Sequence, residues 1–92
     1  MARLSEDEID QGIEQLDGWS REGDAIEKAF ELGDFMGSVG FIDALAPVAE
    51  ELGHHPDLAV SWSTVTVTIT SHSEGGLTAA DLELAGLIDG IA

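Results

Sequence analysis

The sequence predicts an α+β domain in which three helices cover one face of a four-stranded antiparallel sheet, in the order α-β-β-α-β-β-α. Three segments carry apolar residues at helical spacing, and others alternate apolar and polar residues around short turns. A hairpin with one apolar face is marginal alone, so joining two hairpins under the helices is the economical architecture. Because the chain has 92 residues, we expect a single domain, residues 1–92.

The first helix is expected from about Glu6 to Leu16. Ser5 and Glu8 have the spacing of a capping box, in which each side chain accepts a hydrogen bond from the other residue's backbone N–H. The apolar residues that follow share one helical face, and Gly18 supplies a stop.

Two hairpins are expected from the alternating segments. The first begins at Trp19, turns at Gly23–Asp24 and continues to about Leu32. The second has a break near Ser63, between an alternation that ends at Trp62 and a run in which threonines alternate with Val65, Val67 and Ile69. We expect the aromatic residues to pack in the core: Trp19, Phe30, Phe35, Phe41 and Trp62.

The second and third helices have clear boundaries. Asp34 can cap the second helix and Gly53 can end it, and Pro47 is expected to bend it at a cost of ~3 kcal/mol. Thr78 and Asp81 repeat the capping-box spacing at the start of the third helix. The apolar stripe of that helix consists of Leu84, Leu87, Ile88 and Ile91.

The chain is strongly acidic, with 19 Asp and Glu against 3 Lys and Arg and a formal net charge of -16. This charge repels phosphate backbones and anionic membranes, so we expect neither nucleic acid nor a membrane as a partner. An ordinary acidic surface is one interpretation. We favour adaptation to high salt, where the Debye length falls to ~3 Å at 1 M and most self-repulsion is screened.

The absence of cysteine excludes a disulfide scaffold, a thiolate metal site and a cysteine nucleophile. The first nine residues lack the pattern of a signal peptide, and no segment reaches the roughly 20 apolar residues of a membrane span. We therefore expect a soluble, cytoplasmic protein.

All three histidines lie where regular structure is expected to end. His54 and His55 follow the stop at Gly53, Pro56 restricts the backbone behind them, and His72 ends the last strand. An imidazole titrates near neutrality, so it can both donate and accept protons at working pH. These three side chains could bracket one small ligand.

Two carboxylates accompany the histidines: Glu50, one helical turn before His54, and Asp81. With Pro56 and Trp62, these carboxylates and histidines form the pattern E-x3-HHP-x5-W-x9-H-x8-D over residues 50–81. This pattern resembles the signature of the pterin-4a-carbinolamine dehydratase family. Further landmarks agree over nearly the whole chain: Gly18-Trp19, Phe30, Asp34-Phe35 and Gly40-Phe41.

The resemblance implies loss of water from a 4a-hydroxytetrahydropterin to give a quinonoid dihydropterin, with the pterin as substrate and no cofactor. His54 and His72 would transfer protons, His55 would orient the pterin, and Glu50 and Asp81 would hold imidazoles in their tautomers. The implied substrate-binding residues are His54, His55, Pro56, Ser71, His72, Ser73 and Glu74. The resemblance also implies dimers with sheets extended across subunits, and tetramers paired through helices, for which the stripe of the third helix is suited.

Other interpretations stay open at this stage. Asp81 could be only a helix cap, and Glu50 could be a solvated helix residue. His54, His72 and Asp81 also form the ligand set of a non-haem iron site, although we expect no metal. A noncatalytic dimerisation or assembly partner of the same fold is a further alternative.

Overall fold

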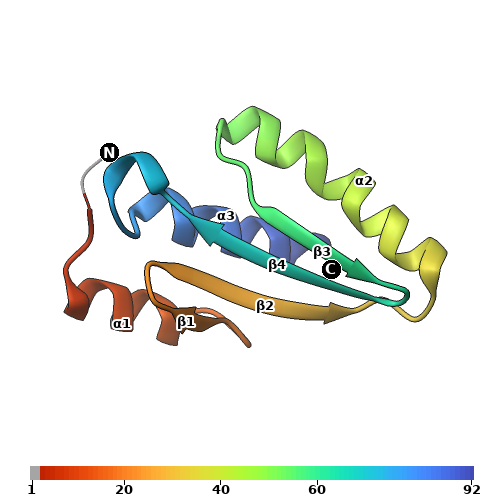
Figure 1. Ribbon diagram of the computed structural model, residues 1–92, viewed down its shortest axis with the longest axis horizontal. Helices are drawn as coiled ribbons and strands as arrows, with labels where there is room; N and C mark the ends of the chain where they lie inside the picture. The colour runs from red at the N-terminus through yellow and green to blue at the C-terminus, as the bar shows by residue number, and fades with distance from the viewer. Residues whose placement is uncertain (1–2) are drawn as a thin grey trace.

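The computed structural model describes residues 3–92 and confirms the predicted order of elements (Figure 1). The first two residues of the predicted domain lie outside the described residues. The elements are α1 (Glu6–Glu14), β1 (Ser20–Glu22), β2 (Ala25–Glu31), α2 (Phe35–Leu52), β3 (Asp57–Ser61), β4 (Thr64–Thr70), a short 3-10 helix η1 (His72–Glu74) and α3 (Ala79–Ile91).

The sheet is antiparallel throughout, with strand order β1-β2-β4-β3. Val65, Val67 and Ile69 of the central strand β4 are fully buried, whereas the threonines between them are half-buried. Alternate residues of a strand point to opposite faces, so one face of the sheet is covered by helices and the other is more open. Figure 1 shows α3 behind the central strands and α2 on the side of β3.

The predicted helix boundaries are largely correct because local side chains satisfy the free backbone groups. Ser5 Oγ accepts from Glu8 N–H at 3.2 Å, and Glu8 accepts from Ser5 N–H at 2.8 Å, which confirms the first capping box. The helix ends at Glu14, two residues before the expected end. In α2, Asp34 caps the start and the helix continues through Pro47, so the proline does not end it; the bend expected there stays a prediction.

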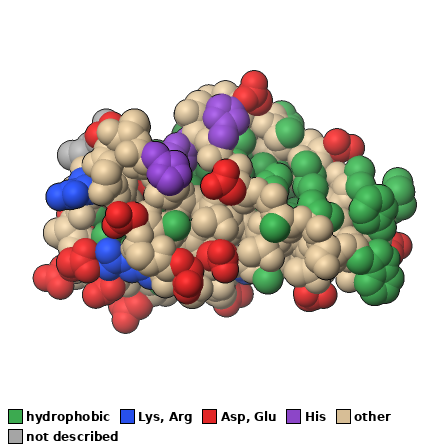
Figure 2. Space-filling view, viewed as in Figure 1, with side chains coloured by type: hydrophobic (Ala, Val, Ile, Leu, Met, Phe, Trp, Pro, Cys, Tyr) green, Lys and Arg blue, Asp and Glu red, His purple; other side chains and the backbone are tan. Residues whose placement is uncertain are grey.

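Two aromatic residues predicted in the core are at the surface, so these predictions were wrong. Phe35 is 52% exposed, and Trp62 is 69% exposed at the tip of the turn between β3 and β4. Trp62 has φ 52°, and its carbonyl accepts a hydrogen bond from Ser38 Oγ at 2.6 Å. Because β3 is the outermost strand, Val60 is also 46% exposed, and Figure 2 shows several hydrophobic side chains at that end of the molecule.

The stripe of α3 is used differently from the prediction. Leu84 and Ile88 have no exposed surface and belong to the core of the subunit, whereas Leu87 is 46% exposed. The helix needs its apolar face to cover the sheet, so most of that stripe is not available to a second subunit.

A polar contact fastens the first hairpin to the C-terminal part of α3. Trp19 is buried as predicted, and its Nε1 donates to both carboxylate oxygens of Asp89, at 3.1 and 3.0 Å. Lys28 Nζ lies 2.8 Å from the same carboxylate, which is 23% exposed. Asp89 therefore binds the hairpin with both hydrogen bonds and charge.

Candidate active site

His54 and His55 occupy the turn between α2 and β3. Gly53 ends α2 with φ 69°, a left-handed conformation that favours glycine, and the N–H of His54 donates to the carbonyl of Ala49 at 3.1 Å. Pro56 follows, and β3 begins at the next residue. The end of the helix thus holds the backbone of His54.

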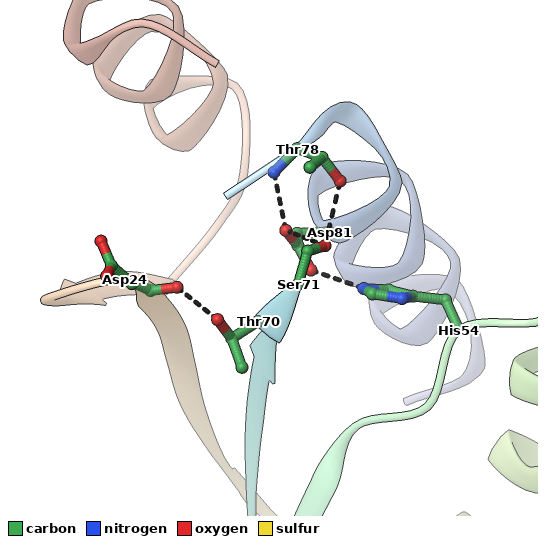
Figure 3. Close-up of polar contacts among 6 residues, drawn as sticks. All are labelled: Asp24, His54, Thr70, Ser71, Thr78 and Asp81. Carbon is green, nitrogen blue, oxygen red and sulfur yellow. Dashed lines mark hydrogen bonds and ion pairs between the residues drawn. The ribbon is translucent and has the colours of Figure 1, made fainter. Parts of the chain in front are cut away.

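The ring of His54 contacts a buried carboxylate (Figure 3). His54 Nε2 lies 2.5 Å from Asp81 Oδ1; the His54 side chain is 19% exposed and that of Asp81 is fully buried. The other oxygen, Asp81 Oδ2, accepts from Ser71 Oγ and from the backbone N–H of Thr78, each at 2.8 Å. Asp81 is therefore both the cap partner of α3 and the partner of an imidazole, and the two interpretations of this residue are compatible.

The geometry defines the tautomer of the neutral imidazole. An ionised carboxylate only accepts hydrogen bonds, so Nε2 carries the proton and Nδ1 keeps its lone pair. Nδ1 makes no hydrogen bond within residues 3–92, and none of the buried side-chain nitrogens and oxygens there lacks a partner. The Nδ1 atom is consequently open to solvent and to a ligand.

His55 has a different partner and a different environment. Its Nε2 contacts Glu50 Oε2, and both side chains lie at the surface, at 60% and 74% exposure. Glu50 thus pairs with His55, and Asp81 pairs with His54. A cavity of about 290 Å³ between α2 and β3 is lined by His55, Glu50 and Pro56 together with apolar side chains, and neither His54 nor His72 lines it.

His72 begins η1, directly after the end of β4, and its ring makes no hydrogen bond within the described part of the chain. His72, Ser73 and Glu74 are exposed, whereas Ser71 is only 6% exposed and its hydroxyl points inward to Asp81. The Ser71 side chain is thus occupied by Asp81, and the contact of Ser71 with substrate stays a prediction. Figure 2 shows the histidine side chains gathered in one region of the surface.

Within residues 3–92, no three His, Cys, Asp or Glu side chains converge in an arrangement that could hold a metal ion. His54, His72 and Asp81 are thus not brought together as such a group, and the iron site considered from the sequence stays open to experiment. In the same residues, no helix has both the length and the apolar character needed to cross a bilayer.

Sequence reasoning missed the roles of Ser71 and Thr78 in this site. Thr78 was predicted only as a helix cap, yet its hydroxyl lies 3.0 Å from Ser71 Oγ. The signal for Ser71 was weak: it is a small hydroxyl residue directly before a histidine, with its partner Asp81 ten residues further on.

These features define an α+β protein with a histidine–carboxylate site at the junction of a helix end and a strand end. The chain belongs to the pterin 4 alpha carbinolamine dehydratase family, whose model matches residues 2–91.

Relatives and solved structures agree with this assignment. Proteins named pterin-4-alpha-carbinolamine dehydratase from Thermosynechococcus vestitus and Metallosphaera sedula are 44% and 45% identical, over 98% and 97% of this chain and 95% and 93% of theirs. A transcriptional coactivator/pterin dehydratase from Brucella melitensis has a TM-score of 0.94 at 37% identity, covering 98% of both chains. A pterin dehydratase-like protein described as a RuBisCO assembly factor in the α-carboxysome has a TM-score of 0.71 at 28% identity, covering 82% of this chain and 89% of its own.

Proposed function

We propose that the protein is a 4a-hydroxytetrahydropterin dehydratase that works without a cofactor in the cytoplasm, as a step of pterin cofactor recycling. It eliminates water from the 4a-hydroxy compound and releases the quinonoid dihydropterin. Membership of the family and the names of relatives support the reaction. The observation that carries the mechanism is the buried Asp81–His54 pair, which leaves His54 Nδ1 with a free lone pair.

The reaction needs an acid that protonates the departing hydroxyl at C4a and a base that receives the proton from N5. His54, after the end of α2, and His72, after the end of β4, supply these two functions. Asp81 accepts from Nε2–H of His54 and stabilises the imidazolium that forms when Nδ1 takes a proton. The exposed ring of His72 makes no hydrogen bond within residues 3–92 that a substrate would have to displace.

His55 and Glu50 orient the substrate in this proposal. His55 directly follows His54 in the turn after α2, and the exposed side chains of His55 and Glu50 can offer hydrogen bonds to a pterin held beside His54. The pair is solvated, so it can exchange partners when a pterin binds at little cost in free energy.

The test is the dehydration of a freshly generated 4a-hydroxypterin, followed by absorbance. His54→Ala and His72→Ala are each expected to lower kcat by roughly 10²- to 10⁴-fold, the usual contribution of a positioned general acid or base. Asp89→Asn is the matched control away from the site and should retain kcat. Wild-type turnover no faster than that of the His54→Ala, His72→Ala double variant would overturn the proposal.

An assembly role is the second candidate, because a structural neighbour is described as an assembly factor. The same assay separates the two functions, since a binding module would show no dehydration above the double variant. Exhaustive chelation tests the metal alternative: full activity without bound metal is expected, and a stoichiometric ion required for turnover would contradict proton transfer by histidines alone.

We propose a homodimer or homotetramer as the working assembly. Among residues 3–92, β3 pairs with β4 alone and is exposed along its whole length, so its outer backbone groups can pair with a second sheet. Light scattering at several concentrations should give a mass of two or four chains, and a monomer at assay concentration would contradict this part of the proposal.

A further inference from the structure

We infer that Ser71 is a positioning residue that couples the two histidine segments through Asp81. The inference rests on the proposed dehydratase function for its kinetic consequence, but its structural basis is independent of that function. Ser71 directly precedes His72, and its hydroxyl lies 2.8 Å from the carboxylate that contacts the ring of His54.

The hydrogen bonds around Asp81 have a defined direction. Ser71 has a single O–H, and the ionised carboxylate can only accept, so Ser71 donates to Asp81 Oδ2. The bond of 3.0 Å between Ser71 Oγ and Thr78 Oγ1 is then donated by Thr78. The result is a directed chain from the Thr78 hydroxyl through the Ser71 hydroxyl to the carboxylate, all of it buried (Figure 3).

The three contacts of Asp81 come from three parts of the fold. Thr78 belongs to the start of the same helix, His54 to the turn after α2, and Ser71 to the end of β4. Within the described residues, Ser71 therefore makes the side-chain bond that joins Asp81 to the segment carrying His72. The position of the His54 ring relative to the His72 backbone depends on this hydroxyl.

Loss of the hydroxyl should loosen the carboxylate without removing it. In Ser71→Ala, Oδ2 keeps the Thr78 N–H, which is local to the helix, and loses its bond to the strand. Asp81 can then rotate, and His54 is no longer restricted to the tautomer protonated at Nε2. The His54 lone pair would be presented at Nδ1 for only part of the time.

The direct experiment is a two-bond ¹H–¹⁵N correlation spectrum of the histidine rings, which identifies the protonated nitrogen. The wild-type protein above the titration range of its histidines should show His54 protonated at Nε2, and Ser71→Ala should show both tautomers. Thr70→Val is the matched control, because its hydroxyl donates to the Asp24 carbonyl at 2.5 Å on the other side of the strand (Figure 3). Thr70→Val should leave the His54 spectrum unchanged.

Kinetics provide the second measurement. Ser71→Ala should lower kcat about tenfold, part of the 10²- to 10⁴-fold that a positioned acid or base contributes, with KM changed less than about twofold. Ser71→Thr keeps the hydroxyl and should restore both kcat and the single tautomer. If Ser71→Ala does not fold, Ser71→Cys fills the same space with a much weaker donor and takes its place.

A single Nε2–H tautomer in folded Ser71→Ala or Ser71→Cys, with kcat within about twofold of wild type, would overturn the inference. If the wild-type protein had no dehydratase activity, the proposed function would fail, while the tautomer spectra would still decide whether Ser71 positions His54.

Discussion

Replacing Asp81 by Asn is the sharpest test of how the site is built, because it removes the charge and keeps the size. The carboxylate accepts three hydrogen bonds: Ser71 Oγ and Thr78 N–H bind Oδ2, and His54 Nε2 binds Oδ1. An amide has only one oxygen. If that oxygen keeps the two donors at the Oδ2 position, the NH₂ group faces His54 Nε2, which must then accept instead of donate.

The expected consequences follow from this exchange. His54 should change to the tautomer protonated at Nδ1, so the atom open to solvent no longer has a lone pair. A hydrogen bond to a charged acceptor contributes roughly 1.5–3 kcal/mol to stability, and one to a neutral acceptor contributes about 1 kcal/mol. The amide also avoids the cost of burying a charge, which offsets part of this loss. We expect the free energy of unfolding to fall by about 1–3 kcal/mol and kcat to fall by about 10²- to 10⁴-fold.

Urea unfolding, the pterin assay and histidine spectra measure the three effects. Asp89→Asn is the control on the same helix. The Asp89 carboxylate accepts hydrogen bonds from Trp19 and Lys28 and contacts no histidine among the described residues. It should lose comparable stability and retain kcat within about twofold. If Asp81→Asn kept kcat within about threefold while His54 was protonated at Nδ1, the proposed role of that lone pair would be refuted.

Four further predictions concern charge, pH, strain and the exposed pair. The side chains of the three Lys and Arg residues already make contacts, so most of the 19 acidic side chains repel one another without a cation beside them. The urea concentration at the unfolding midpoint should therefore rise when KCl is raised from about 0.1 M to about 2 M, and a fall would contradict salt adaptation. The backbone N–H of Ser5 lowers the pKa of Glu8 in the folded state, so its stabilisation is present above the unfolded pKa and is lost as pH falls through the folded value. The stability of the wild type should therefore fall more than that of Glu8→Gln between about pH 5 and 3 in urea melts, and parallel losses would exclude this contribution. Trp62→Gly removes a left-handed non-glycine residue and should raise the free energy of unfolding by up to about 1 kcal/mol in the same melts; a lower free energy of unfolding would contradict this account of strain. Glu50→Gln breaks an exposed pair with His55 and should change stability by less than about 1 kcal/mol while KM rises more than kcat falls; a large loss of stability would show that the pair is structural.

The parts of the fold that the sequence predicts well are those whose chemistry is local. Ser5 and Glu8 are three residues apart, and so are Thr78 and Asp81, so the sequence reveals both partners of each cap. The error at Trp62 has the opposite origin. An alternating pattern shows which residues share a face, but not where the strand ends or that it lies at the edge of the sheet.

The candidate site divides in the same way. The sequence supplies His54, His55, Glu50 and Asp81 as members of one set, but it cannot assign the pairs. His54 and Asp81 are 27 residues apart and meet only because α3 packs beside the end of α2. Ser71 was missed as a partner because its burial and the direction of its hydroxyl depend on where β4 ends relative to α3.

Asp81 shows why a single carboxylate can serve both the fold and the site. A buried charge is costly unless hydrogen bonds compensate it, and here its donors come from the start of α3, the end of β4 and the turn after α2. These donors are in place only when the three elements have docked, so folding itself places the His54 ring. His55 and Glu50 come from one helix end and stay solvated, so their arrangement can change when a ligand binds. In the proposed mechanism, the held ring of His54 transfers a proton, and the solvated ring of His55 can change partners to bind the substrate.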